Sequence, residues 1–241
     1  ERRCTVTDRF SASQAPRLIQ CPSSGNLDGA IEGWVPPVVD HDKGAKGKGT
    51  EIHKIFENSA KYTASDMMMI AKAIEYVATL RQKRRFKILT EFQTVADWLP
   101  SKPQTTMDLV LYVQDEIHVV DYKTGKIPVD PVGNEQLMFY ALCAAHLAPK
   151  AKGVTVHIVQ PWAGIMEGWF ADTITLQDFM KLAQQQEAKV TSKTIEFGPG
   201  DHCMFCPANP HSRGDKGSPL CPVMMDLLYP QHIDEDEILS L

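Results

Sequence analysis

Ile117-His118-Val119-Val120-Asp121-Tyr122-Lys123-Thr124-Gly125 joins an apolar run to a glycine turn, as expected of a buried strand that ends at a loop. Side chains alternate between the two faces of a strand, so Asp121 and Lys123 point one way and Tyr122 the other. A carboxylate beside an ammonium at a strand end can hold a divalent cation and a reacting phosphate together. Asp108 lies thirteen residues upstream in a second strand-like run. Two acids and a lysine on paired strands therefore indicate metal-dependent phosphodiester cleavage.

The two carboxylates suit a hard cation. Mg²⁺ prefers a few oxygen ligands and retains several of its waters. Asp108 and Asp121 supply such oxygens, and the backbone carbonyl of Tyr122 is a further candidate ligand. Lys123 could position or deprotonate the attacking water, or stabilise the developing negative charge. Taken alone, Asp-x-Lys-x-Gly is also typical of a surface strand that ends in a turn.

Two other parts of the chain fit such a site. His53 follows Gly49 at the expected start of a helix, and its imidazole could supply a nitrogen ligand, although a single helical histidine is more often structural. Gln136 and Tyr140 are spaced four apart in the helix expected after Lys123, so they share one helical face. An ordinary helix–sheet contact would produce the same pair.

The periodicity of apolar residues predicts a mixed α/β sheet flanked by helices, with one active edge. A helix is expected from about residue 63, with an apolar face of Ile70, Ala73, Ile74, Val77 and Leu80. Later helices are expected at 132–147 and after residue 175. The expected strands are 87–95, 105–113, 116–123, 153–160 and 168–174.

The length and charge of the chain bound the alternatives. With 241 residues the sequence suits one large domain or two small ones, and we expect a single domain, 1–241, whose core spans about 49–190. The net charge of −5 argues against a wholly basic nucleic-acid coat but allows a local basic channel. Basic clusters occur at 43–48 and 81–87, and solvated loops or helix ends are the other interpretation of them.

The order of these motifs resembles the RecB-type branch of the PD-(D/E)XK nucleases over residues 49 to 140. The matching residues are Gly49…His53, Asp108, Asp121-Tyr122-Lys123 and Gln136…Tyr140. The resemblance implies a restriction-endonuclease-like fold around a bound Mg²⁺ or Mn²⁺. It also implies roles: His53, Asp108 and Asp121 would bind the metal, Lys123 would be catalytic, and Gln136 and Tyr140 would support the site or the DNA. Glu91 is either an outer acid of this site or a surface strand residue.

Cysteines gather near the two ends of the chain. Cys203 and Cys206 form a CxxC, and Cys221 follows fifteen residues later, a spacing typical of zinc or iron–sulfur ligands. The fourth ligand is either a local histidine or a distant cysteine; the candidates are His202, His211, Cys21 and Cys4. Cys143 lies in an apolar helical run and is expected to be a core residue.

The family resemblance favours the distant cysteine. AddB and the four-cysteine CRISPR-associated exonucleases carry one cysteine before the nuclease core and three after it, around a [4Fe–4S] cluster. By this resemblance Cys21 would join Cys203, Cys206 and Cys221, with cluster-binding segments at about 15–25 and 200–225. The gap before Cys221 is longer than is usual in that subset. The cluster would have a structural role in joining the N- and C-terminal segments, and Zn²⁺ is the alternative metal.

The resemblance also implies a substrate and a setting. It implies an exonuclease that degrades linear DNA for recombination or repair in a phage or prophage, with a recombination or single-strand-annealing protein as a further partner. One alternative is a catalytically silent nuclease fold that serves as a DNA-binding or assembly module. Another is an interaction protein that is held together by a bound metal and whose strand motif is accidental. No apolar run approaches the roughly 18 residues of a membrane span, and no signal-peptide pattern opens the sequence. We therefore expect a cytoplasmic protein of a bacterial or phage-infected cell, with no membrane partner.

Overall fold

The computed structural model describes residues 10–31, 34, 64–80, 86–113, 115–209 and 221–228. The predictions for His53, Cys4 and His211 lie outside these residues. The chain divides into two compact units, which we call the sheet unit (Glu1–Ala15 with Asp40–Gln184) and the terminal unit (Pro16–Val39 with Gln185–Leu241). None of the described helices is both long enough and apolar enough to cross a membrane.

The sheet unit is built around five strands whose order in the sheet follows their order in the chain. These are β1 (Phe86–Val95), β2 (Gln104–Val113), β3 (Glu116–Tyr122), β4 (Gly153–Gln160) and β5 (Ile165–Asp172). All neighbouring pairs are antiparallel except β3 and β4, which are parallel. A parallel pair needs a crossover, and α5 (Glu135–Ala145) lies within it. The predicted mixed α/β sheet flanked by helices is confirmed.

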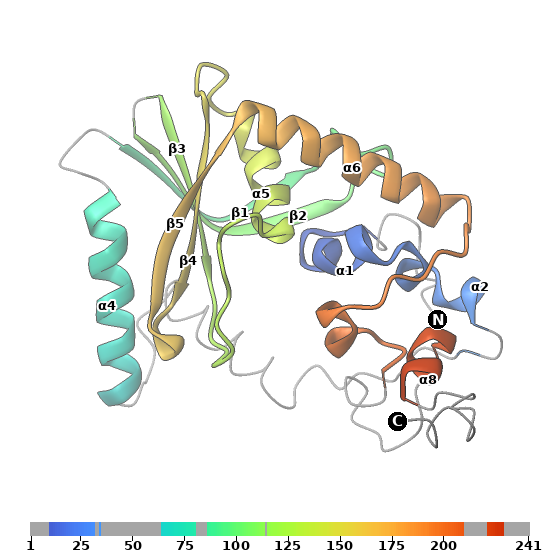
Figure 1. Cartoon of the computed structure of the whole chain (residues 1–241). Helices are drawn as coiled ribbons and strands as arrows, with labels where there is room; N and C mark the ends of the chain where they lie inside the picture. Colours follow the sequence, from blue (N-terminus) through green and yellow to red (C-terminus); the bar gives the residue numbers. More distant parts are fainter. Residues whose placement is uncertain are drawn as a thin grey trace, which may run out of the picture. The chain divides into compact units, whose positions relative to one another are not determined.

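Helices lie on both faces of this sheet, with α4 (Ala64–Leu80) on one side and α5 on the other (Figure 1). Ala73 and Val77 of α4 form one apolar cluster with strand residues that include Leu109 and Val120. Because side chains alternate along a strand, the residues next to Leu109 and Val120 face away from α4. This alternation turns Asp108 and Asp121 towards the side of the sheet that α5 covers.

The N-terminus of α5 is capped by a side chain. The amide oxygen of Asn134 accepts a hydrogen bond from the backbone N–H of Leu137, with N and O 3.1 Å apart. Asn134 has an extended backbone, and Gly133 before it has a left-handed φ of 64°. The helix therefore begins at Glu135, three residues after the expected start, because the preceding turn uses residues that cannot continue it.

A similar cap sets the start of α6 (Thr173–Thr191). The carboxylate of Asp172 accepts a hydrogen bond from the N–H of Thr175 at 2.8 Å, so the helix begins before the residue at which it was expected. Phe179 of α6 packs on Trp98, whose ring also meets Phe139 of α5 edge-on, with centroids 4.9 Å apart. Trp98 thereby fixes α5 against the rest of the sheet unit. Cys143 of α5 is only 2% exposed, which confirms the core position predicted for it.

The terminal unit combines a segment near the start of the chain with the segment that follows Gln184. It contains α2 (Leu27–Ala30), η5 (Asp201–Phe205), α8 (Pro222–Leu228), most of α1 (Ala15–Gln20) and the end of α6. Ser23 and Glu196 exchange two hydrogen bonds: the N–H of Ser23 donates to the Glu196 carbonyl, and the N–H of Glu196 donates to the Ser23 hydroxyl at 2.6 Å. A Cβ on Gly198 would lie 2.1 Å from the Gln20 carbonyl oxygen, so this close approach requires glycine.

Candidate active site

Asp108 and Asp121 lie opposite each other on neighbouring strands. Leu109 pairs with Val120, and the next step of the same antiparallel register brings Asp108 opposite Asp121. A carboxylate oxygen of Asp108 accepts a hydrogen bond from the N–H of Tyr122 at 2.7 Å. Asp121 is only 3% exposed, whereas Asp108 is half-buried. The two carboxylates therefore lie on adjacent strands at the end of the β2–β3 ladder, where both offer hard oxygen ligands.

Lys123 and Gln136 complete this cluster. The Lys123 ammonium lies 2.9 Å from Oδ2 of Asp121 and donates to Oε1 of Gln136 at 2.8 Å. The Gln136 amide nitrogen lies 3.4 Å from Oδ1 of Asp121 and 3.0 Å from the Tyr140 hydroxyl. One glutamine side chain therefore contacts the carboxylate, the ammonium and the phenol. The helical spacing of Gln136 and Tyr140 predicted a shared face, and α5 turns that face towards the acids.

Tyr122 and Tyr140 both have a pKa raised above the ordinary value of a phenol. Burial raises the pKa of Tyr140, and the nearby Asp121 carboxylate raises it further. Burial likewise raises the pKa of Tyr122, with a second contribution from Asp108. Because the Tyr140 oxygen accepts a hydrogen bond from Gln136, its own proton is left to donate. Tyr140 can therefore act as a neutral donor beside the acids.

Gln160 holds the loop that follows Lys123. Its side chain is almost completely buried at the end of β4, next to β3 in the sheet. Its Nε2 donates to the carbonyls of Gly125 and Ile127 at 2.8 and 2.7 Å, and its Oε1 accepts from the N–H of Val129 at 3.0 Å. All of these bonds end on one loop, so Gln160 fixes the backbone immediately after the Asp-Tyr-Lys motif. The sequence reasoning missed this residue, since a glutamine at a strand end carries no motif of its own.

Glu91 lies beside Asp108 with an unusual backbone. Thr90 pairs with Leu109 and Phe92 pairs with Met107, so Glu91 occupies the position opposite Asp108, where the ladder is interrupted. Its φ is 45°, a left-handed value that is uncommon for a residue with a side chain and is found mainly where function or packing enforces it. Glu91, Asp108 and Asp121 therefore occupy matching positions on the neighbouring strands β1, β2 and β3.

The structure brings together five of the six residues predicted for the catalytic site: Asp108, Asp121, Lys123, Gln136 and Tyr140. The sixth, His53, is not among the described residues. The carboxylate pair supplies oxygen donors of the kind that Mg²⁺ and Mn²⁺ prefer. Metal binding by these acids and by the Tyr122 carbonyl stays a prediction.

The four predicted cluster cysteines meet in the terminal unit. Cys21, Cys203, Cys206 and Cys221 line one small, mainly apolar cavity. In the part of the chain that the structure describes, no three His, Cys, Asp or Glu side chains form a ready-made metal site. Burial raises the pKa of the Cys206 thiol, whereas Arg17, which lies next to it, lowers that pKa. Such a cation would stabilise thiolates once a metal group had displaced their protons.

Fold and site together define an α/β protein with a carboxylate pair and a lysine at one end of its central strands. Its sequence matches the model of a family described as "Protein of unknown function (DUF2800)" over residues 73–241. The chain belongs to this family. The matched region holds Asp108, Asp121, Lys123, Gln136 and Tyr140, together with the three C-terminal cysteines of the cavity.

Two solved structures are similar to the chain at low sequence identity. One, from Eubacterium rectale, is described as a "Putative exonuclease"; it is 11% identical, with a TM-score of 0.48 over 92% of this chain and 94% of that one. The other, described as SSO0001, is 12% identical, with a TM-score of 0.37 over 82% of each chain. The case for a function therefore depends on the side chains of this protein itself.

Proposed function

We propose that this protein is a metal-dependent nuclease that hydrolyses phosphodiester bonds of DNA at the Asp108–Asp121–Lys123 site. The observation that carries the proposal is the network in which Gln136 contacts both the Asp121 carboxylate and the Lys123 ammonium. Opposed acids and a fixed ammonium are the groups that phosphoryl chemistry needs: oxygen ligands for a cation, and a positive charge or proton carrier beside the reacting water.

Hydrolysis joins a water oxygen to phosphorus and breaks the bond from phosphorus to the leaving oxygen, which gains a proton. A bound Mg²⁺ or Mn²⁺ would neutralise phosphate charge and activate the water. Asp108 and Asp121 would hold that cation, and His53 would add a nitrogen ligand. The Lys123 ammonium positions the water and stabilises the negative charge that develops on the phosphate. Gln136 orients the ammonium, and the neutral Tyr140 donates a hydrogen bond towards the substrate.

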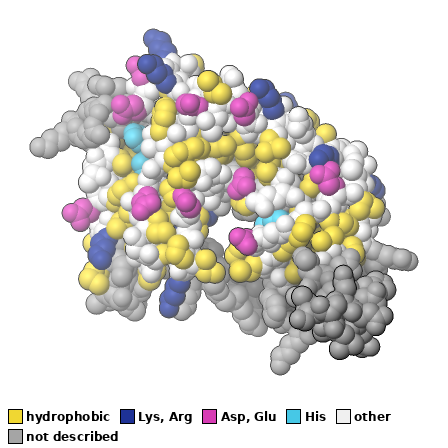
Figure 2. Space-filling model, in the orientation of Figure 1, with side chains coloured by type: hydrophobic (Ala, Val, Ile, Leu, Met, Phe, Trp, Pro, Cys, Tyr) yellow, Lys and Arg dark blue, Asp and Glu magenta, His cyan; other side chains and the backbone are white. Residues whose placement is uncertain are grey.

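The motif resemblance extends the proposal to its biological setting. By that resemblance the protein acts as an exonuclease on linear DNA and exposes single strands for recombination or repair in a bacterial or phage-infected cytoplasm. A recombination or single-strand-annealing protein would then receive the product. On the face shown in Figure 2, the visible Lys and Arg side chains are scattered among acidic ones instead of forming a broad patch.

Incubation with Mg²⁺ and either linear or covalently closed circular DNA tests the nuclease proposal. The parent protein should release nucleotides from linear DNA and leave closed circles intact, and Asp121→Asn should abolish that release. Asp178→Asn is a matched control, because Asp178 is exposed on α6 and, among the described residues, pairs with Lys181. Release of nucleotides from neither substrate would reject the nuclease proposal, and cleavage of the circles would reject its exonuclease part.

The four cysteines carry a second, structural part of the proposal. Cys21, Cys203, Cys206 and Cys221 are the candidate ligands of a [4Fe–4S] cluster, because all four line one cavity and Arg17 lies beside Cys206. When bound, the cluster would supply a covalent link between the two segments of the terminal unit. Zn²⁺ bound by the same thiolates is the alternative, and the colour of the purified protein distinguishes the two.

A further inference from the structure

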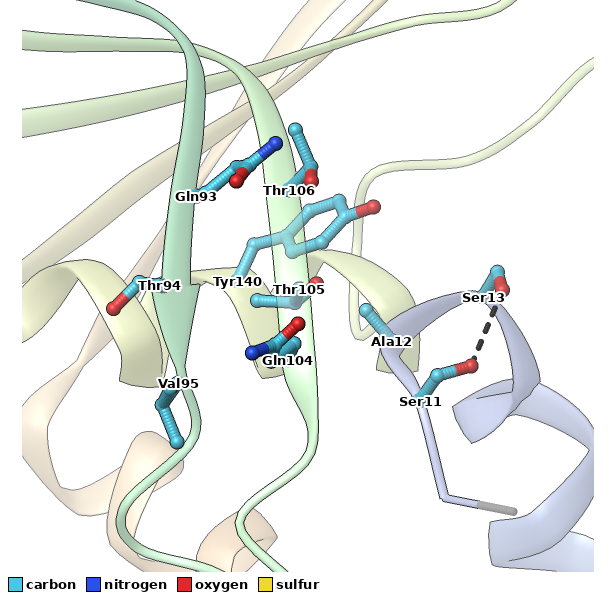
Figure 3. A pocket seen from close by; sticks show the side chains of 10 residues that line it. All are labelled: Ser11, Ala12, Ser13, Gln93, Thr94, Val95, Gln104, Thr105, Thr106 and Tyr140. Atoms are coloured by element: carbon cyan, nitrogen blue, oxygen red, sulfur yellow. Dashed lines mark hydrogen bonds between the residues drawn. The ribbon is translucent and has the colours of Figure 1, made fainter. Parts of the chain in front are cut away.

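An open cavity of about 480 Å³ lies in the sheet unit beside Tyr140 (Figure 3). It is separate from the catalytic acids but shares this one residue with their network. Its walls come from β1, β2, α5 and the residues around η2 (Ala12–Gln14). The lining residues are Ser11, Ala12, Ser13, Gln93, Thr94, Val95, Gln104, Thr105, Thr106 and Tyr140.

Strand geometry connects this cavity to the candidate active site. Gln104, Thr106 and Asp108 are alternate residues of β2, so they lie in a row on one face, with about 6.6 to 6.8 Å between successive members. Gln93 of β1 pairs with Thr106, so its side chain lies on the same face of the sheet, one strand away. A strand of nucleic acid that is held at Asp108 and follows this row would pass over Thr106 and Gln104, into the cavity.

The lining has a distinctive chemistry because it is polar but uncharged. Hydroxyls and amides predominate, and neither an acidic nor a basic side chain lines the cavity within the described ranges. The Gln93 and Gln104 side chains are exposed, and neither has a hydrogen-bond partner among the residues that the structure describes. An amide both donates and accepts hydrogen bonds, as does the edge of a nucleobase, whereas a phosphate diester only accepts them.

We infer that this cavity takes an unpaired nucleobase of the substrate strand, next to the phosphodiester at Asp108 and Asp121. The inference rests on the proposed nuclease function and adds its substrate class: a single-stranded or frayed DNA end. A base in a duplex uses its Watson–Crick edge for pairing, so it must leave the helix before the Gln93 and Gln104 amides can reach that edge. Hydrogen bonds without a lysine or arginine would give contacts that depend little on salt.

Binding of oligonucleotides without divalent metal tests the inference independently of catalysis. The full-length protein in EDTA is titrated with a fluorescent single-stranded oligonucleotide and with an abasic strand of the same length, which keeps every phosphate. The parent should bind the abasic strand about fivefold to tenfold more weakly. Gln93→Ala with Gln104→Ala should weaken binding of the normal strand by the same factor and leave binding of the abasic strand unchanged.

Gln177→Ala is the matched control, since Gln177 is an exposed glutamine of α6 that does not line the cavity. Equal affinity of the parent for the normal and abasic strands would overturn the cavity assignment. If Asp121-dependent hydrolysis were nevertheless observed, the nuclease proposal would stand without it. Absence of hydrolysis from all substrates would reject the nuclease function, whereas base-dependent binding lost in the double variant would still support the cavity.

Discussion

Gln136 is the side chain on which the arrangement of the candidate site most depends. Its carbonyl oxygen accepts from Lys123, and its nitrogen faces both Asp121 and Tyr140. A carboxylate in this position could not donate to Asp121, and an aliphatic side chain could do neither. The amide is thus suited to hold a negative group and a positive group side by side without adding a charge of its own.

Gln160 has a comparable role one strand away, and its removal gives the first prediction. Gln160→Leu leaves two carbonyls and one N–H of the loop 125–129 without their buried partner. We expect the unfolding free energy to fall by about 1–3 kcal/mol, measured by urea denaturation. Gln177→Leu, at an exposed site, should change it little. Equal stability of the Gln160→Leu protein and the parent would show that the loop does not depend on this side chain.

His157 is a buried histidine whose surroundings favour its neutral form. Its Nδ1 lies 2.9 Å from the Tyr76 hydroxyl, and its Nε2 lies 3.0 Å from Nδ1 of His118, whose other nitrogen is 3.8 Å from Glu116. Burial lowers the pKa of His157 to about 3, and the neighbouring His118 adds to that shift. The unfolded chain therefore binds one more proton than the folded chain between the folded pKa and the ordinary value of about 6.5.

The second prediction is a loss of stability as the pH falls through this window. Because the folded pKa is depressed, the stability that neutral His157 permits is present above pH 6.5 and is lost on acidification, at up to ~1.4 kcal/mol per pH unit. Unfolding free energies measured between pH 7 and pH 4 should show this slope. His157→Gln should flatten it, and His146→Gln, at an exposed site, should not. An unchanged slope in His157→Gln would assign the acid sensitivity to other groups.

At the scale of single elements, β4 and β5 depend on one glycine. Gly168 pairs with His157, and a Cβ at position 168 would lie 2.4 Å from Nδ1 of the imidazole. Gly168→Ala should therefore lower the unfolding free energy by about 1–3 kcal/mol, because the ring must move and disturb its bond to Tyr76. In a His157→Ala background the same substitution should cost much less. An equal loss of unfolding free energy in the two backgrounds would show that the His157 ring does not exclude a Cβ at position 168.

The strands and their faces were predictable from sequence because period-two alternation is a local property. The alternation predicted strand 153–160 at its observed bounds. It also predicted that Asp121 and Lys123 point to the same side. Helical faces were less predictable: Ile74 was expected in the apolar face of α4 but is 59% exposed, and the half-buried Tyr76 bonds to His157 instead. Which residues of a helix become buried depends on its rotation against the sheet, and this is a tertiary property.

The candidate site was predictable to a similar extent. Its acids, lysine, glutamine and tyrosine follow from motif order and spacing. Two features could not be predicted from the sequence: the hydrogen bonds of Gln160 to the loop 125–129, and the left-handed backbone of Glu91. Both depend on tertiary contacts that local sequence patterns do not specify. The metal roles and the DNA substrate stay predictions at this scale.

At the scale of the whole molecule, two segments that lie far apart in the sequence form one compact unit. The terminal unit combines Pro16–Val39 with Gln185–Leu241, and it contains all four cysteines that line the small apolar cavity. Hydrogen bonds between Ser23 and Glu196 already join these distant segments. In the chain-entropy model, a covalent link across such a long loop adds on the order of 4–5 kcal/mol of stability.

The fourth prediction concerns this link. Anaerobically purified protein should be brown, with broad visible absorbance, and Cys203→Ala should lose that absorbance and unfold at a lower temperature. Cys143→Ala is the control, since Cys143 is a buried thiol of α5 outside the cavity. Colourless protein that contains one equivalent of zinc would contradict the cluster and leave the zinc alternative. Colourless, metal-free protein would reject both.

The most direct measurement of the central claim compares metal binding with hydrolysis in the same proteins. Mn²⁺ binding and cleavage of an end-labelled linear DNA are measured for the parent, Asp121→Asn and Lys123→Met. If Asp108, Asp121 and Lys123 form one metal-dependent site, the Asp121→Asn protein should lose both Mn²⁺ binding and DNA cleavage. Lys123→Met should still bind Mn²⁺ but hydrolyse DNA at least about 100-fold more slowly. Cleavage at the parental rate by both variants would contradict the account.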